Sequence, residues 1–177
     1  IAANPNQSAA VNDWLGTLDH AKVRVLRADQ PLADAALINA CSHEAQGEYL
    51  VLMTADAEVV NPNWIESLLN HAQRPEVGVV GAKLVDRDGK IAQAGLILGL
   101  NGDVGSAFIG EKHDADGYMH RLSVEQNYSA VSAVCLMIGN ELFKALGGLD
   151  EVSFGAGFSD VDLCRAGDQR GEETIQL

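Results

Sequence analysis

The clearest structural signal in the sequence is Gly47-Glu48-Tyr49-Leu50-Val51-Leu52-Met53-Thr54-Ala55-Asp56-Ala57-Glu58. The apolar run at residues 49–53 predicts a buried strand. Thr54-Ala55-Asp56 follows at once, so a carboxylate stands at the carboxyl end of this strand. Ligands of open α/β sheets bind just outside the carboxyl ends of the strands. The stretch therefore predicts an α/β sheet with a binding site at this point.

Strand and helix patterns alternate along the rest of the chain. Residues 22–27, 77–84, 90–100, 128–138 and 174–177 read as strands, and residues 9–18, 33–44 and 62–73 read as helices. Residues 22–53 are interpreted as a βαβ unit with parallel strands, which places residues 49–53 inside the sheet. A turn is expected at residues 86–89 and a long loop at residues 101–121. The fold class that follows is α/β, with a mainly parallel mixed sheet flanked by helices.

Composition narrows the range of partners. The chain has 177 residues, enough for a single domain over 1–177, and a net charge of −13. Such acidity argues against nucleic acid, whose phosphates need clustered Lys and Arg. An acidic protein that binds an anionic nucleotide needs a local cation, typically a divalent metal on carboxylates. No apolar run approaches the ~20 residues of a transmembrane helix, so no transmembrane segment is expected. Three widely spaced cysteines predict neither disulfides nor a zinc site and fit the cytoplasm.

Four motifs, in this order, resemble family 2 glycosyltransferases, which are inverting nucleotide-sugar enzymes with the GT-A fold. They are Ala45-x-Gly47-Glu48-Tyr49-Leu50-x-Leu52 with Asp56, then Gly81-Ala82-Lys83-Leu84, Gly147-Gly148-Leu149-Asp150-Glu151 and Asp160-Val161-Asp162-Leu163. In that family the strand before Asp56 ends in Asp-x-Asp, whereas Thr54 takes the first position here. The resemblance implies that Asp56 binds Mg²⁺ or Mn²⁺, and that Thr54 and Asp56 belong to the nucleotide-sugar site.

The resemblance also assigns a catalytic residue. Inverting transfer needs a carboxylate that deprotonates the acceptor hydroxyl, and Asp160 matches the family's base. Asp162, Gly147, Gly148 and Asn39 match positions of the nucleotide-sugar site, and we expect Asp56 and Asp160 to face one cleft. Simpler interpretations stay open. Asp160 and Asp162 are also favourable as acidic residues at a helix N-terminus, Asn39 as a helix surface residue, and Asp56 as a turn residue.

The predicted function is metal-assisted transfer, with inversion, from a nucleotide-diphosphate sugar to a glycan or other hydroxyl acceptor, such as a lipid-linked one. Relatives of this kind make bacterial surface polysaccharides, often as rhamnosyl- or similar sugar transferases. The expected location is the cytoplasm, or the periphery of the inner membrane for the full-length protein. The alternative is a non-catalytic nucleotide- or glycan-binding module that retains the GT-A fold. Thr54, an incomplete first strand and the absence of a downstream His predict a fragment truncated at both ends and of weak activity. The sugar, the nucleotide, the acceptor, further domains and the oligomeric state stay open.

Overall fold

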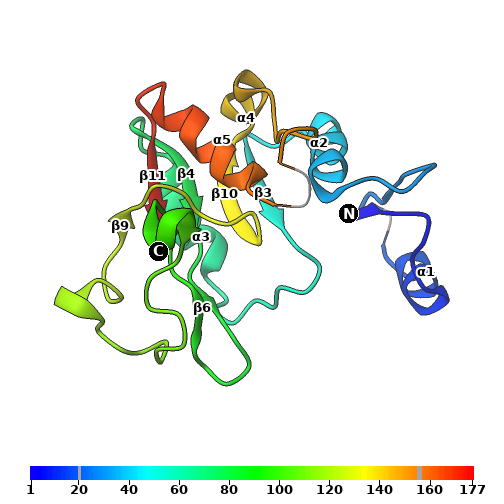
Figure 1. The fold of residues 1–177 in the computed structure, drawn as a ribbon. Helices are drawn as coiled ribbons and strands as arrows, with labels where there is room; N and C mark the ends of the chain where they lie inside the picture. The colour runs from blue at the N-terminus through cyan, green and yellow to red at the C-terminus, as the bar shows by residue number, and fades with distance from the viewer. Residues whose placement is uncertain (20, 155–156) are drawn as a thin grey trace. The chain divides into compact units, whose positions relative to one another are not determined.

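The fold is that of a computed structural model, which describes residues 1–19, 21–154 and 157–177. Figure 1 traces the chain through its helices and strands. The chain forms two compact units, residues 1–46 with 149–159 and residues 47–148 with 160–177. Each unit is described by itself.

The first unit contains a small βαβ arrangement at its start. Strand β1 (Ala2–Ala3) pairs in parallel with β2 (Leu26–Arg27), and helix α1 (Ala9–Gly16) connects them. Ser8 caps α1, because its hydroxyl accepts a hydrogen bond from the backbone N–H of Val11 at 3.3 Å. Helix α2 (Asp34–Glu44) follows and buries Ala35, Leu37 and Ser42. The helices expected in this region are therefore confirmed, with slightly shorter bounds.

The βαβ unit expected over residues 22–53 is wrong. Strand β2 is limited to Leu26–Arg27 and pairs with β1, not with the strand at residues 49–53. Lys22 and Val23 form a turn and not a strand, because the backbone N–H groups of both residues donate to the carbonyl of Asp19 at 2.9 Å. A turn at this position leaves too few residues for the longer strand that the sequence pattern predicted.

The second unit is built on a five-stranded sheet with the order β3-β10-β4-β11-β9. Its strands are β3 (Tyr49–Met53), β4 (Val77–Gly81), β9 (Gln126–Asn127), β10 (Cys135–Gly139) and β11 (Glu173–Gln176). Strands β3, β4 and β11 run in one direction, and β10 and β9 run in the other. This mixed sheet confirms the α/β class. The expectation of mainly parallel pairing is wrong, because three of the four strand pairings described in this sheet are antiparallel. Strand β3, however, lies at the edge of the sheet in the part of the chain that the structure describes, so its expected interior place is wrong.

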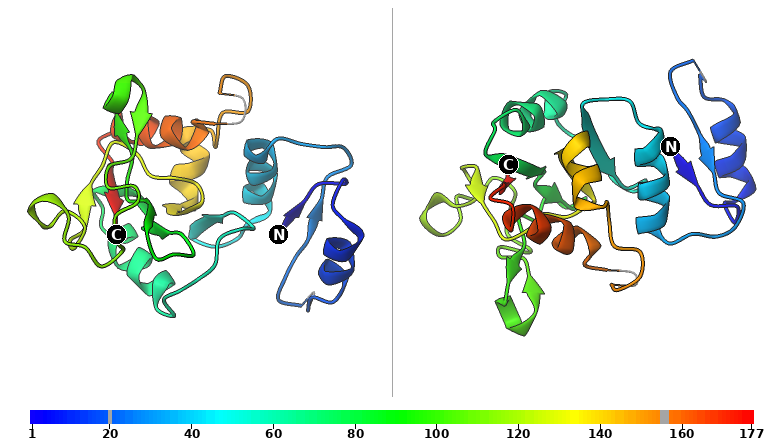
Figure 2. Two further views of the ribbon diagram at one scale, coloured as in Figure 1. Left: turned by 60° about the horizontal axis from the view of Figure 1, so that its bottom comes forward. Right: turned by 90° about the horizontal axis from the view of Figure 1, so that it is seen from above.

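Helices cover both faces of this sheet (Figure 2). Helix α3 (Trp64–Ala72) buries Leu68 and Ala72 in a cluster with Val80 and Met137 on one face. On the other face lies helix α5 (Ser159–Asp168), whose Cys164 thiol is 3.9 Å from the carbonyl oxygen of Val131. Helix α4 (Asn140–Leu146) continues directly from β10. Gly139 holds the N-cap position of α4. Each fully buried Leu, Ile or Phe stabilises such a core by roughly 1.5–3 kcal/mol.

Short hairpins follow β4 in place of two long strands. Strands β5 (Leu84–Val85) and β6 (Ile91–Gln93) pair antiparallel, and β7 (Ile97–Leu98) pairs with β8 (Val104–Gly105). The expected turn between β5 and β6 is confirmed, with Gly89 at a φ of 73° and its N–H bonded to the Asp86 carbonyl. A short 3₁₀ turn, Leu100–Gly102, connects β7 to β8, and a second one, Tyr118–His120, lies in the loop that follows β8.

We predict that Gly81→Ala destabilises the sheet. A Cβ at this position would stand 2.4 Å from the Cβ of Val131, a fully buried side chain that has no room to move. Overpacking of this kind costs about 1–3 kcal/mol of the free energy of unfolding. Urea denaturation followed by circular dichroism measures the loss. Gly16→Ala is the matched control, because nothing lies within 4 Å of the point where its Cβ would stand, and it should leave stability unchanged or slightly raised. Equal midpoints for Gly81→Ala and the wild type would contradict the packing argument.

Candidate functional site

The first predicted site residues lie directly after β3. The backbone N–H of Thr54 donates to the carbonyl of Val134 at 3.1 Å, which extends the pairing with the chain before β10 by one step. The N–H of Ala57 then returns to the Thr54 carbonyl at 3.2 Å, closing a turn. This turn leaves Asp56 exposed at the carboxyl end of the strand, where the sequence predicted it.

Thr54 acts directly on Asp56. Its hydroxyl donates to Oδ1 of Asp56 at 2.6 Å. This hydrogen bond, followed by one from the backbone of Asp56 itself, holds the pKa of the Asp56 carboxyl below its usual value. A carboxylate has about four lone-pair sites, and the hydroxyl of Thr54 occupies one of them. Asp56 is thus an ionised group with capacity to bind a cation.

Asp160, the predicted base, lies in the first turn of helix α5 and is held by two backbone groups. Its Oδ2 accepts from the N–H of Ala133 at 3.0 Å, and its Oδ1 accepts from the N–H of Val161 at 2.9 Å. Asp160 and Asp162 both lie in the first turn of the helix, where negative charge is favourable. The interpretation of these residues as helix-stabilising therefore fits, and it is compatible with a catalytic role.

A single short segment connects the two carboxylate positions. Ala133 donates to Asp160, while the next residue, Val134, accepts from Thr54. The hydroxyl of Ser132 accepts from the N–H of Val134 at 3.2 Å and braces the same segment. The structure thus ties the end of β3 and the start of α5 to residues 132–134. That Asp56 and Asp160 face one cleft stays a prediction.

Gly147 and Gly148 end helix α4. They have φ values of 91° and 77°, and the N–H of Gly148 donates to the carbonyl of Phe143 at 3.0 Å. A side chain would disfavour both conformations, so this pair is needed where the chain reverses. Their predicted place beside a bound sugar stays a prediction.

Asn39 has partners that the sequence did not indicate. Its side chain bonds both backbone groups of Leu149, at 2.8 and 2.9 Å, and Nδ2 also donates to Oε1 of Glu151 at 2.7 Å. Asn39 is therefore not merely a helix surface residue. The carboxylate of Asp150 accepts from the N–H groups of Val152 and Ser153, at 2.7 Å each. The bonds from Ser153, then from Val152, lower the pKa of the Asp150 carboxyl.

Neither a cluster of metal ligands nor a membrane-spanning helix is evident in the described residues. No group of three or more His, Cys, Asp or Glu side chains there could hold a metal ion, and Asp56 is the predicted ligand at the end of β3. That donor set still fits Mg²⁺, which is commonly held by one or two carboxylates together with phosphate oxygens and water. Among the same residues, no helix is long and apolar enough to span a membrane.

A cavity of about 320 Å³ lies elsewhere on the second unit. Its lining contains none of the predicted site residues and consists of Ser67, Asn70, His71, Lys83, Leu122, Ser123, Val124, Glu125 and Leu177.

Comparison with known proteins identifies the family. The model of Glycosyl transferase family 2 matches residues 7–144. This chain belongs to glycosyl transferase family 2. The matched region of this family 2 chain contains Asn39, Thr54 and Asp56, and it ends before the glycine pair and Asp160.

Two curated relatives and one solved structure are similar. The chain is 42% identical over 166 residues to the uncharacterized protein y4gI of Sinorhizobium fredii, and 34% identical over 164 residues to the O-antigen biosynthesis protein RfbC of Myxococcus xanthus. These matches cover 93% and 92% of the chain, but only 18% and 12% of the two relatives. The mannosyltransferase PcManGT of Pyrobaculum calidifontis, solved with GDP-Man and Mn²⁺, superposes with a TM-score of 0.65 at 15% identity. That match covers 98% of the chain and 44% of the mannosyltransferase, and it confirms the GT-A fold.

We predict that Thr54→Val raises the pKa of the Asp56 carboxyl. The Thr54 hydroxyl stabilises the ionised carboxylate, so its removal favours the protonated form. Thr54→Ser keeps the hydroxyl and should keep the lowered pKa. A titration of the Asp56 carboxyl carbon by ¹³C NMR measures both variants. If the carboxyl titrates alike in Thr54→Val and the wild type, the hydroxyl is not the cause.

Proposed function

We propose that this chain belongs to the catalytic part of a glycosyltransferase that moves a sugar from a nucleotide-diphosphate donor to a hydroxyl of a glycan or lipid-linked acceptor, with inversion. One observation carries the proposal. In a family 2 chain, residues 132–134 bond both the start of the turn that bears Asp56 and the carboxylate of Asp160. A donor-side carboxylate and an acceptor-side carboxylate are the two groups that such a transfer needs.

Asp56 is the proposed ligand of Mg²⁺ or Mn²⁺ on the donor side. The solved mannosyltransferase binds GDP-Man and Mn²⁺, which supports a nucleotide sugar and a divalent cation for this chain as well. When bound, the cation neutralises the negative charge that develops on the departing diphosphate. Thr54 contributes orientation, because its hydroxyl bond to Oδ1 fixes the carboxylate of Asp56. Asp162, Gly147 and Gly148 complete the proposed nucleotide-sugar site.

Asp160 is the proposed general base. Two backbone N–H groups, from Ala133 and Val161, fix one bond to each of its oxygens and leave lone pairs for an acceptor hydroxyl. The acceptor hydroxyl gives its proton to Asp160. At the same time, the hydroxyl oxygen attacks the anomeric carbon from the face opposite the departing diphosphate. This geometry inverts the anomeric configuration.

The name of the relative from Myxococcus xanthus, an O-antigen biosynthesis protein, supports a role in making a cell-surface polysaccharide. We propose that the reaction takes place in the cytoplasm or at the periphery of the inner membrane. A second candidate, a binding module without transfer activity, is favoured by one feature. The end of β3 offers a single carboxylate, since Thr54 stands where the family has the first Asp.

Asp160→Asn should reduce sugar transfer by about 10²–10⁴-fold, because the amide cannot take the proton from the acceptor. Affinity for the nucleoside diphosphate should stay unchanged. The assay is transfer or hydrolysis with a panel of nucleotide sugars and Mn²⁺. Asp168→Asn is the matched control, an exposed carboxylate in the last turn of the same helix. Wild-type turnover by Asp160→Asn would exclude Asp160 as the base, and nucleotide binding without any transfer would favour the binding module.

Asp56→Asn should abolish the effect of Mn²⁺ on nucleotide binding. A ligand that binds only the folded state raises thermal stability by an amount set by its concentration and Kd. We expect GDP or UDP to stabilise the wild type more strongly with Mn²⁺ than without it, and Asp56→Asn to lose this difference. Asp114→Asn, an exposed carboxylate elsewhere on the same unit, is the control. An unchanged Mn²⁺ effect in Asp56→Asn would show that the cation binds elsewhere.

A further inference from the structure

The side-chain amide of Asn39 joins two segments that are 110 residues apart. Nδ2 donates to the carbonyl of Leu149 at 2.8 Å, and Oδ1 accepts from the N–H of the same residue at 2.9 Å. Both backbone groups of Leu149 are therefore paired by one side chain, as they would be by a neighbouring strand. The arrangement also fixes the amide orientation, because a flipped amide would place like groups against each other.

The second N–H of Nδ2 is used as well. It donates to Oε1 of Glu151 at 2.7 Å, and bonds to an ionised acceptor are among the stronger ones in proteins. The amide of asparagine has two N–H donors, and both are occupied within the protein. A bound nucleotide or sugar could take one of them only by displacing Leu149 or Glu151.

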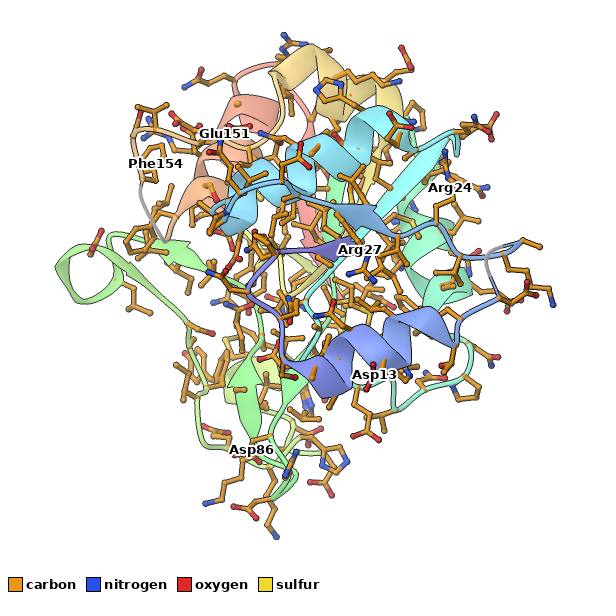
Figure 3. All side chains as sticks on the ribbon, turned by 90° about the vertical axis from the view of Figure 1, so that its right-hand side faces the viewer. Asp13, Arg24, Arg27, Asp86, Glu151 and Phe154 are labelled. Atoms are coloured by element: carbon orange, nitrogen blue, oxygen red, sulfur yellow. The ribbon has the colours of Figure 1, made fainter. Side chains whose placement is uncertain are left out.

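The segment that Asn39 holds is the start of the loop before α5, whose described residues are 149–154 and 157–158. It follows the glycine pair, buries Leu149 to 3% exposure and then exposes Val152 to 88%. Figure 3 shows Glu151 and Phe154 on this loop, with Glu151 beside α2. In the sequence, this loop precedes helix α5, which carries Asp160.

We infer that Asn39 is a positioning residue that clamps the start of this loop to α2, and that it makes no direct contact with the donor. The clamp itself does not depend on the proposed function. Its consequence for catalysis does rest on that function, since a displaced loop would disturb the acceptor step and leave nucleotide binding intact.

Hydrogen exchange of the Leu149 amide, followed by NMR, tests the clamp without any assay of activity. Asn39→Ala removes all three bonds and should speed exchange at Leu149 by roughly tenfold or more. Exchange at Leu136, in the core of β10, should stay slow and shows that the variant is folded. Unchanged exchange at Leu149 in folded Asn39→Ala would overturn the inference.

A pair of substitutions that exchanges the amide of Asn39 with the carboxylate of Glu151 provides the matched control. Asn39→Asp keeps an acceptor for the Leu149 N–H but sets a carboxylate against Glu151, so exchange should again be faster. Adding Glu151→Gln supplies a new N–H donor to that carboxylate and should recover part of the protection. Glu151→Gln alone should behave as the wild type, because its amide oxygen still accepts from Asn39. Failure of the double variant to recover any protection would contradict the paired contact.

Calorimetry with GDP and UDP separates the clamp from a donor contact. If Asn39 acts only as a clamp, Asn39→Ala should change the Kd for GDP or UDP by less than about threefold and should lower kcat. Loss of a direct hydrogen bond to the donor would instead weaken nucleotide binding by about tenfold. A tenfold loss of affinity with unchanged exchange at Leu149 would overturn the inference. If neither nucleotide binds the wild type, the proposed donor site fails, and the exchange experiment still decides the clamp.

Discussion

The antiparallel pairing of β3 with β10 is the constraint on which the second unit depends. It runs through five residue pairs, from Met53 opposite Cys135 to Tyr49 opposite Gly139. A shift of one residue would move every buried side chain of β10 to the other face of the sheet. The same register sets the end of β3 beside residues 132–134, where Thr54 meets Val134 and Asp160 meets Ala133. The core and the candidate site are thus fixed by one ladder.

The acidity of the chain gives this arrangement its chemical character. With a net charge of −13, a diphosphate would be repelled by most of the surface, so a cation is needed wherever it binds. Asp56 supplies an ionised oxygen at an exposed strand end, and Thr54 orients it through a neutral hydroxyl. Replacing a carboxylate by threonine removes a charge from the proposed cation site but also removes the repulsion between two neighbouring carboxylates. Orientation by a hydroxyl is thus a different physical solution from a paired carboxylate.

Local patterns in the sequence predicted where strands, turns and helices lie better than they predicted which strands pair in the sheet. The apolar run at residues 49–53, the turn at residues 86–89 and helix α3 are where periodicity and turn chemistry placed them. The predicted pairing of β3 with residues 22–27 was wrong. Hydrophobic periodicity shows that a strand is buried, but it does not show which strand lies beside it. The choice of β10, more than 80 residues away, depends on side-chain packing across the sheet. The contacts of Asn39 were missed for the same reason, since nothing in a helix pattern identifies a partner 110 residues away.

Asparagine side chains take over tertiary pairing where this fold has few long strands. Asn4 bonds both backbone groups of Leu32, Asn39 does the same with Leu149, and Asn140 donates to the carbonyl of Gly47 at 2.7 Å. An amide has a donor and an acceptor side by side, so it can satisfy a lone peptide as a strand would. Each of these contacts holds a loop or helix end that no ladder reaches, and unpaired peptide groups at such places would be costly. An asparagine that matches a family motif can therefore be required by the backbone alone, without any contact to the substrate.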